Sequence, residues 1–100
     1  MTTRRNERLS VLAAAVLRGD PGAAEVLHRQ MRERGVDPTP LLRRAEEGLA
    51  ATDTELDDLL CQLREGIDGD HLLAQASGLL KERAGWWRLL DVVRRVEAGG

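Results

Sequence analysis

Apolar residues recur at intervals of three and four along almost the whole chain, which is the spacing of one face of an α-helix. Leu9, Leu12 and Val16 show it near the start of the chain, and Leu89 and Val93 show it near the end. No segment combines strict alternation of apolar and polar residues with the β-branched enrichment of a strand. The pattern therefore predicts an all-α protein.

Start and stop signals divide this pattern into short helices. Gly19, Gly35 and Gly66 follow three of the apolar sets, and glycine readily takes the left-handed conformation that closes a helix. Asp20 and Pro21 supply a capping oxygen and a first-turn proline, so the second helix is expected to begin there.

Further signals raise the expected number of helices to five or six. In the Asp-Pro-Thr-Pro segment 37–40, either the aspartate or the threonine caps the proline that follows it. Thr52 followed by Glu55 forms a capping box, which predicts a separate fourth helix. The Asp-Gly-Asp segment 68–70 is expected to cap a fifth. Gly85 either separates a sixth helix or bends a single long one.

Short helices with short connections predict antiparallel neighbours, so we expect a compact bundle that forms one domain over residues 1–100. The chain has no Phe and no Tyr, and its core must therefore consist mainly of Leu, Val and Ala. Trp86 and Trp87 point about 100° apart on a helix. Because Trp86 aligns with Leu90 and Val93, we expect it in the core and Trp87 at the edge.

Charge is strongly segregated along the sequence. Residues 53–70 contain seven acids and one base, whereas both flanking stretches are net basic, although the whole chain carries a net charge of only −2. A helical body with acidic and basic faces can attract copies or relatives of itself, and Trp and Arg are frequent in binding hot spots. We therefore predict a protein-interaction domain whose partner is itself or a similar helical domain. The predicted partner-binding residues are Asp57, Asp58, Trp87, Arg88, Arg94 and Arg95.

The sequence offers little for catalysis or metal binding. His28, His71 and the lone Cys61 show none of the spacings of zinc sites, and phosphate-binding glycine loops are absent. Cys61 is expected to behave as a small buried apolar residue. We expect no catalytic residue, no cofactor and no metal ligand.

The composition also predicts where the protein works. A single cysteine suits a reducing cytoplasm, and no stretch approaches the length of a membrane-spanning helix. The excess of Arg over Lys, with abundant Ala, Gly and Leu, indicates a bacterial genome rich in G and C.

A DNA-binding regulator that uses the Arg-rich first half is the alternative hypothesis. Its candidate contacts are Arg4, Arg5, Arg8, Arg29, Arg32, Arg34, Arg43 and Arg44. Phosphate binding requires several unopposed cations, and acidic residues interrupt this series. The isoelectric point near 5.7 also argues against a nucleic-acid partner.

Residues 79–93 (LLKERAGWWRLLDVV) place a small-residue break between one helix and a second helix that is apolar and basic. This pattern resembles the closing helices of small bacterial death-like, or effector-associated, adaptor domains. The resemblance implies assembly of like with like, no catalysis, and a context of signalling or defence. Such domains are often joined to an effector, so the resemblance implies a separate effector protein or an excised domain here.

Overall fold

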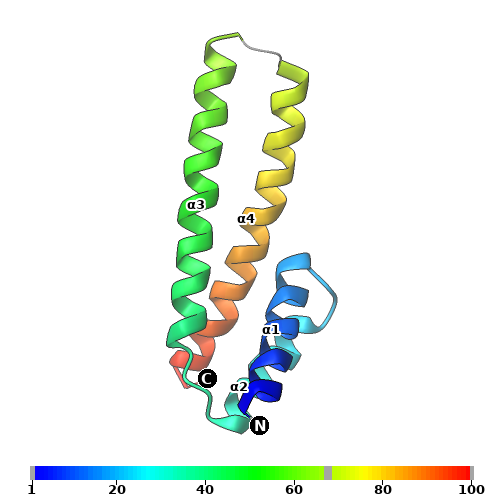
Figure 1. Ribbon diagram of the computed structural model, residues 1–100, viewed down its shortest axis with the longest axis vertical. Coiled ribbons are helices and arrows are strands. Elements are labelled where there is room, and N and C mark those ends of the chain that lie inside the picture. Colours follow the sequence, from blue (N-terminus) through cyan, green and yellow to red (C-terminus); the bar gives the residue numbers. More distant parts are fainter. Residues whose placement is uncertain (1, 67–68, 100) are drawn as a thin grey trace.

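A computed structural model describes residues 2–66 and 69–99, with side chains from residue 8 onward (Figure 1). This part of the chain forms four helices: α1 (Thr2–Arg18), α2 (Ala23–Arg34), α3 (Thr39–Arg64) and α4 (Gly69–Glu97). The expected all-α class is confirmed. The expected number of five or six helices is wrong, because two predicted boundaries lie inside long helices.

The predicted helix ends are confirmed where glycine follows an apolar set. Gly19 and Gly35 have φ angles of 82° and 61°, a region that side chains with a Cβ rarely adopt. At the end of α1 the Asp20 amide donates to the Ala15 carbonyl at 3.0 Å. These turns satisfy carbonyls that the ending helix leaves unpaired.

The predicted helix starts are shifted by up to two residues. Helix α2 begins at Ala23 after Gly22, and the Asp20 carboxylate pairs with Arg18 at 2.9 Å instead of capping α2. Helix α3 begins at Thr39, whose amide and hydroxyl both donate to the Asp37 carboxylate. The hydrogen bond from the Thr39 amide, and after it the one from the Thr39 hydroxyl, lowers the pKa of Asp37, because both stabilise the charged carboxylate. Asp68, part of the predicted cap of α4, lies outside the described residues.

Thr52 does not start a helix. Its hydroxyl donates to the Gly48 carbonyl, one turn earlier, at 2.7 Å, and α3 continues through the capping-box sequence. A cap is worth about 1 kcal/mol, which is less than the burial of apolar residues on both sides of Thr52 in one continuous helix. Thr52 is itself buried, on the side of α3 that packs against α4.

Gly85 does not separate two helices either. It is buried inside α4, where the backbone of α1 crosses. A Cβ at this position would come within 3.0 Å of the Leu17 carbonyl oxygen. The glycine that looks like a helix break in the sequence is therefore a contact point between two helices. The small-residue break in the adaptor resemblance falls in continuous helix, and the resemblance itself stays a prediction.

Helices α3 and α4 form an antiparallel hairpin whose contact positions are alternately three and four residues apart, as in a coiled coil (Figure 1). All of these positions are buried or half-buried. On α3 they are Ala45, Leu49, Thr52, Leu56, Leu59 and Leu63. On α4 they are Leu72, Ala76, Leu79, Arg83, Trp86, Leu90 and Val93.

Helices α1 and α2 pack against a second face of α4 and complete the core. Leu27, Met31 and Leu89 are fully buried there, together with Val16 and Val93. The core is built mainly from Leu, Val and Ala, as expected, and Met31 joins them. Trp86 packs against it and covers Gly48, where a Cβ would overlap the indole ring.

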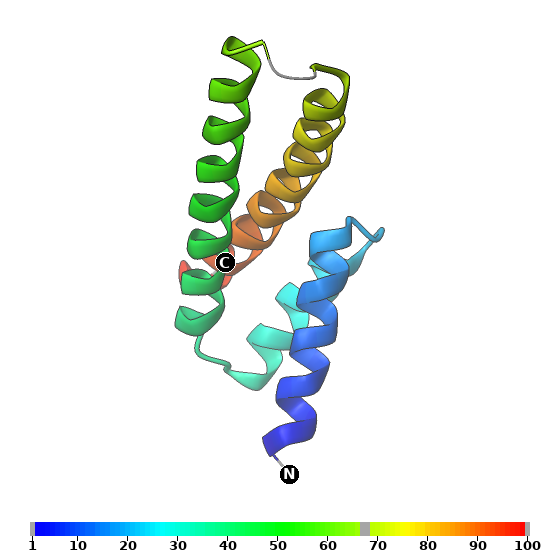
Figure 2. The ribbon, with the colours of Figure 1, turned by 45° about the horizontal axis from the view of Figure 1, so that its top comes forward.

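The hairpin is much longer than the α1–α2 pair, so its distal half projects beyond the rest of the molecule (Figures 1 and 2). We call this half, residues 51–66 and 69–84, the arm. The molecule measures 51 × 25 × 21 Å, and its radius of gyration is 16.1 Å. A compact domain of 100 residues has about 13 Å. The chain thus forms a helical bundle, as expected, but the bundle is elongated rather than compact.

Candidate protein-interaction surface

Four large apolar side chains are exposed among the described residues of the hairpin. Leu60 on α3 is 52% exposed, and on α4 Leu73, Leu80 and Trp87 are 59%, 56% and 45% exposed. The exposure of Trp87 agrees with the expectation that it lies at the edge of the core. We call this set of four residues the open face.

The three α4 members of the open face lie on one side of the helix because they are seven residues apart. The small residues Ser77 and Ala84 fall between them, and both are exposed. The stripe Leu73–Ser77–Leu80–Ala84–Trp87 therefore repeats the four-three spacing of the contact with α3. Helix α4 carries two apolar seams, and α3 occupies only one of them.

A chain of polar contacts shows that α3 contributes to the same face. The Arg83 guanidinium pairs with Asp53 of α3 at 2.7 Å and lies 5.8 Å from the centre of the Trp87 ring. Leu60 is two helical turns beyond Asp53 and on the same side of α3. Leu60 and the α4 stripe therefore flank one surface, and Arg83 holds Trp87 in place within it.

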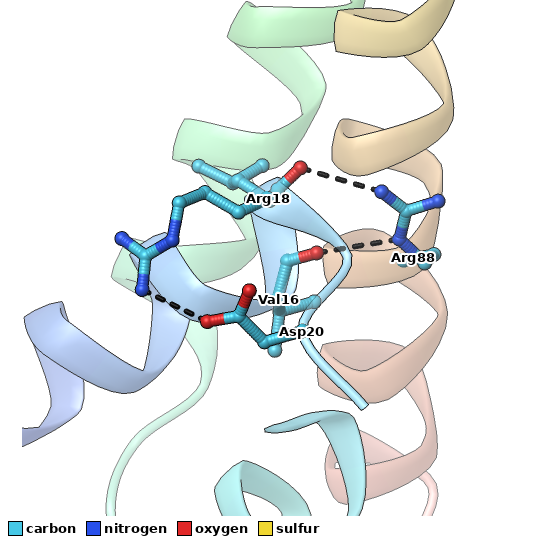
Figure 3. Close-up of polar contacts among 5 residues, drawn as sticks. Val16, Arg18, Asp20 and Arg88 are labelled. Atoms are coloured by element: carbon cyan, nitrogen blue, oxygen red, sulfur yellow. Dashed lines mark hydrogen bonds and ion pairs between the residues drawn. The ribbon is translucent and has the colours of Figure 1, made fainter. Parts of the chain in front are cut away.

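The opposite side of α4 is occupied by α1 and α2. There the Arg88 side chain crosses to the end of α1, where its Nε donates to the Val16 carbonyl and its Nη2 to the Leu17 carbonyl, both at 3.3 Å (Figure 3). A cation at this position also complements the negative end of the α1 dipole. Arg88, a predicted partner-binding residue, thus makes contacts within its own chain.

Replacing Arg88 by Met should destabilise the fold by about 1 kcal/mol, because two α1 carbonyls lose a charged donor. Denaturant unfolding monitored by circular dichroism measures this loss. The matched control is Arg95→Met, since the ion pair that Arg95 forms within the described residues is with exposed Asp91 one turn away, at 3.4 Å. Equal losses in the two variants would mean that Arg88 does not cap α1.

The other predicted partner-binding residues are all exposed, but they lie at different levels of the molecule. Asp57 and Asp58 lie on the arm, whereas Arg94 and Arg95 lie in the last turn of α4, at the opposite end of the hairpin. One copy therefore does not bring these acids and arginines together. The sequence pattern does not reveal that Leu60, Leu73 and Leu80 are exposed, because they have the same helical spacing as the buried leucines.

No group of three or more potential metal ligands occurs within residues 2–66 and 69–99. Cys61, expected to be buried, is exposed on the arm. It lies just past the exposed Leu60, on the side of α3 that has no partner helix. A hollow near the end of α2, lined by Met31, Val36 and Val96 among others, is open to solvent.

The side chains of Arg4 and Arg5 lie outside the described ones. The remaining arginines of the first half are exposed, apart from half-buried Arg34, and they are mixed with acids. Arg29 and Arg32 on α2 lie beside exposed Glu33, and Arg43 and Arg44 begin an α3 surface that continues with exposed glutamates. Acids thus remain close to the cations that would contact phosphates.

Among the described residues, no helix is both long enough and apolar enough to span a membrane. Comparisons with protein-family models, curated proteins and solved structures found no significant match. The geometry of the chain itself therefore carries the functional argument.

Proposed function

We propose that this chain is a non-catalytic, cytoplasmic protein-interaction domain of the adaptor or self-assembly type. Its binding surface is the open face of the α3–α4 hairpin, and the charged residues around that face select and orient the partner. The observation that carries the proposal is the second apolar seam of α4, which keeps coiled-coil spacing but has no helix packed on it.

Two physical arguments support this role. Large apolar side chains gathered on one exposed surface, rather than scattered singly, are typical of protein-binding sites. Tryptophan and arginine are enriched in binding hot spots, and on this surface the Arg83 guanidinium lies 5.8 Å from the centre of the exposed Trp87 ring. The acids of the arm then contribute to recognition more than to affinity.

Leu80→Glu should weaken association by roughly tenfold or more, because it places a charge in the centre of the apolar surface. Association is measured in two ways: mass by light scattering over a range of concentrations, and capture of proteins from a lysate of the producing cells. The matched control is Val11→Glu on α1, because Val11 is 65% exposed and lies outside the open face. The control should associate like the unaltered chain.

If Leu80→Glu associates as strongly as Val11→Glu in both measurements, the open face is not the binding surface. The DNA-binding alternative is tested with the same preparations by mobility-shift titration at two salt concentrations. A shift that weakens steeply with salt, and that Leu80→Glu leaves unchanged, would favour the alternative.

A further inference from the structure

We infer that the partner of the open face is a second copy of this chain, and that two arms pack antiparallel about a twofold axis close to Leu80. This inference rests on the proposed function and names its partner. Three features of the molecule lead to it: its surplus surface, the symmetry of the α4 stripe and the placement of charge along the hairpin.

The surface of the single copy is too large for a compact monomer. It exposes 6873 Å², whereas a folded monomer of 11.1 kDa typically exposes roughly 5,700 Å². The surplus of roughly 1,200 Å² exceeds the roughly 800 Å² that each partner loses in a standard interface. The projecting arm contributes to this surplus, so pairing of arms would bring the exposed area back toward the usual range.

The α4 stripe is symmetric about Leu80. Leu73 lies seven residues before it and Trp87 seven residues after it, all on one side of the helix. When two α4 helices pack antiparallel, Leu80 meets Leu80 of the other copy and each Leu73 meets a Trp87. The large indole then faces a leucine rather than another indole, and the small residues between them allow close approach of the helices.

The charges favour antiparallel over parallel pairing. The described end of the arm carries the exposed acids Glu65 and Asp70 beside Arg64, a net negative charge. The opposite end of α4 carries exposed Arg94 and Arg95, together with Arg88 that caps α1, against the acids Asp91 and Glu97, a net positive charge. Parallel arms would place acid beside acid and base beside base. Antiparallel arms place the acidic end of each copy beside the basic end of the other, so that opposite charges meet across the interface.

This arrangement also changes which acids meet which arginines. In the register centred on Leu80, Asp70 lies at the level of Leu90 of the other copy, between Arg88 and Arg94 and beside Asp91, which is paired with Arg95. Asp57 instead lies nearer the middle of the interface, at the level of the exposed Lys81, whereas Asp58 lies about 160° around α3 from Leu60 and points away from the open face. Acids of one copy still meet bases of the other, but Asp57 and Asp58 are not the acids that lie near Arg94.

Cysteine cross-linking tests the register directly. In a Cys61→Ser background, one chain carries Gly69→Cys and a second, distinguishable by a tag, carries Asp91→Cys. Both positions are exposed, lie in line with the α4 stripe and stand eleven residues from Leu80. At Gly69 a Cβ meets no atom within 4 Å, so the substitution fits the fold.

Under mild oxidation the mixture should yield the mixed disulfide between the two variants, several-fold in excess of either disulfide between like chains. In the antiparallel dimer two Gly69 positions are about 33 Å apart along the axis, far beyond disulfide reach. A predominance of like-with-like disulfides would overturn the antiparallel register.

The unaltered chain supplies an independent measurement. Its mass in light scattering should rise from one copy to two as concentration increases. A single-copy mass at every concentration would overturn the inference of a second copy. The proposed function would survive that result if capture of another protein still depended on Leu80, so the two failures are distinguishable.

Discussion

Gly85→Ala should destabilise the protein by about 1–3 kcal/mol, although alanine is the better helix former. The new Cβ would meet the Leu17 carbonyl oxygen of α1, which belongs to the backbone and cannot rotate away. Helix α1 must therefore move outward, which loosens its packing on Leu89 and Val92 and draws its end away from Arg88. Denaturant unfolding followed by circular dichroism measures the loss.

Gly78→Ala is the matched control on the same helix. Gly78 is exposed, and a Cβ there meets no atom within 4 Å. The substitution should therefore stabilise the protein by about 0.5–1 kcal/mol, because alanine loses less conformational freedom in a helix. Opposite signs for the two variants are expected. Stabilisation by Gly85→Ala would show that α1 does not cross α4 at this point.

Much of the fold could be predicted from the sequence, but not the continuity of the two long helices. The helical class, the closing glycines at 19 and 35, and the core position of Trp86 follow from local rules and are confirmed. The interruption predicted at Thr52 is wrong, and of the two alternatives left open at Gly85 the structure has the single long helix. Local rules describe the isolated helix, where glycine and a capping box favour an end, whereas packing across the α3–α4 seam holds each helix together.

The candidate surface was only partly predictable for a related reason. The charges on the arm and the exposure of Trp87 could be inferred from the sequence, but the exposure of Leu60, Leu73 and Leu80 could not. In the α4 sequence the residues of the second seam have the same helical spacing as those of the first. Which seam is covered depends on the side of α4 against which α3 packs, and that is a property of the whole fold.

Leu89→Ala and Leu73→Ala should therefore have very different effects, although both remove a leucine from an apolar position of α4. Leu89 is fully buried among α1, α2 and α4, so its removal should cost about 2–5 kcal/mol through lost burial and the cavity left behind. Leu73 is mostly exposed in a single copy, and its removal should cost less than about 0.5 kcal/mol at low protein concentration.

Concentration separates the two variants further. If arms pair, the unaltered chain gains stability as its concentration rises, because association favours the folded state. Leu73→Ala should reduce that gain, since Leu73 faces Trp87 of the other copy, whereas Leu89→Ala should shift stability equally at all concentrations. Thermal unfolding at two concentrations, about a hundredfold apart, measures both effects. A large loss for Leu73→Ala at the lower concentration would mean that the α4 stripe is already buried within one copy.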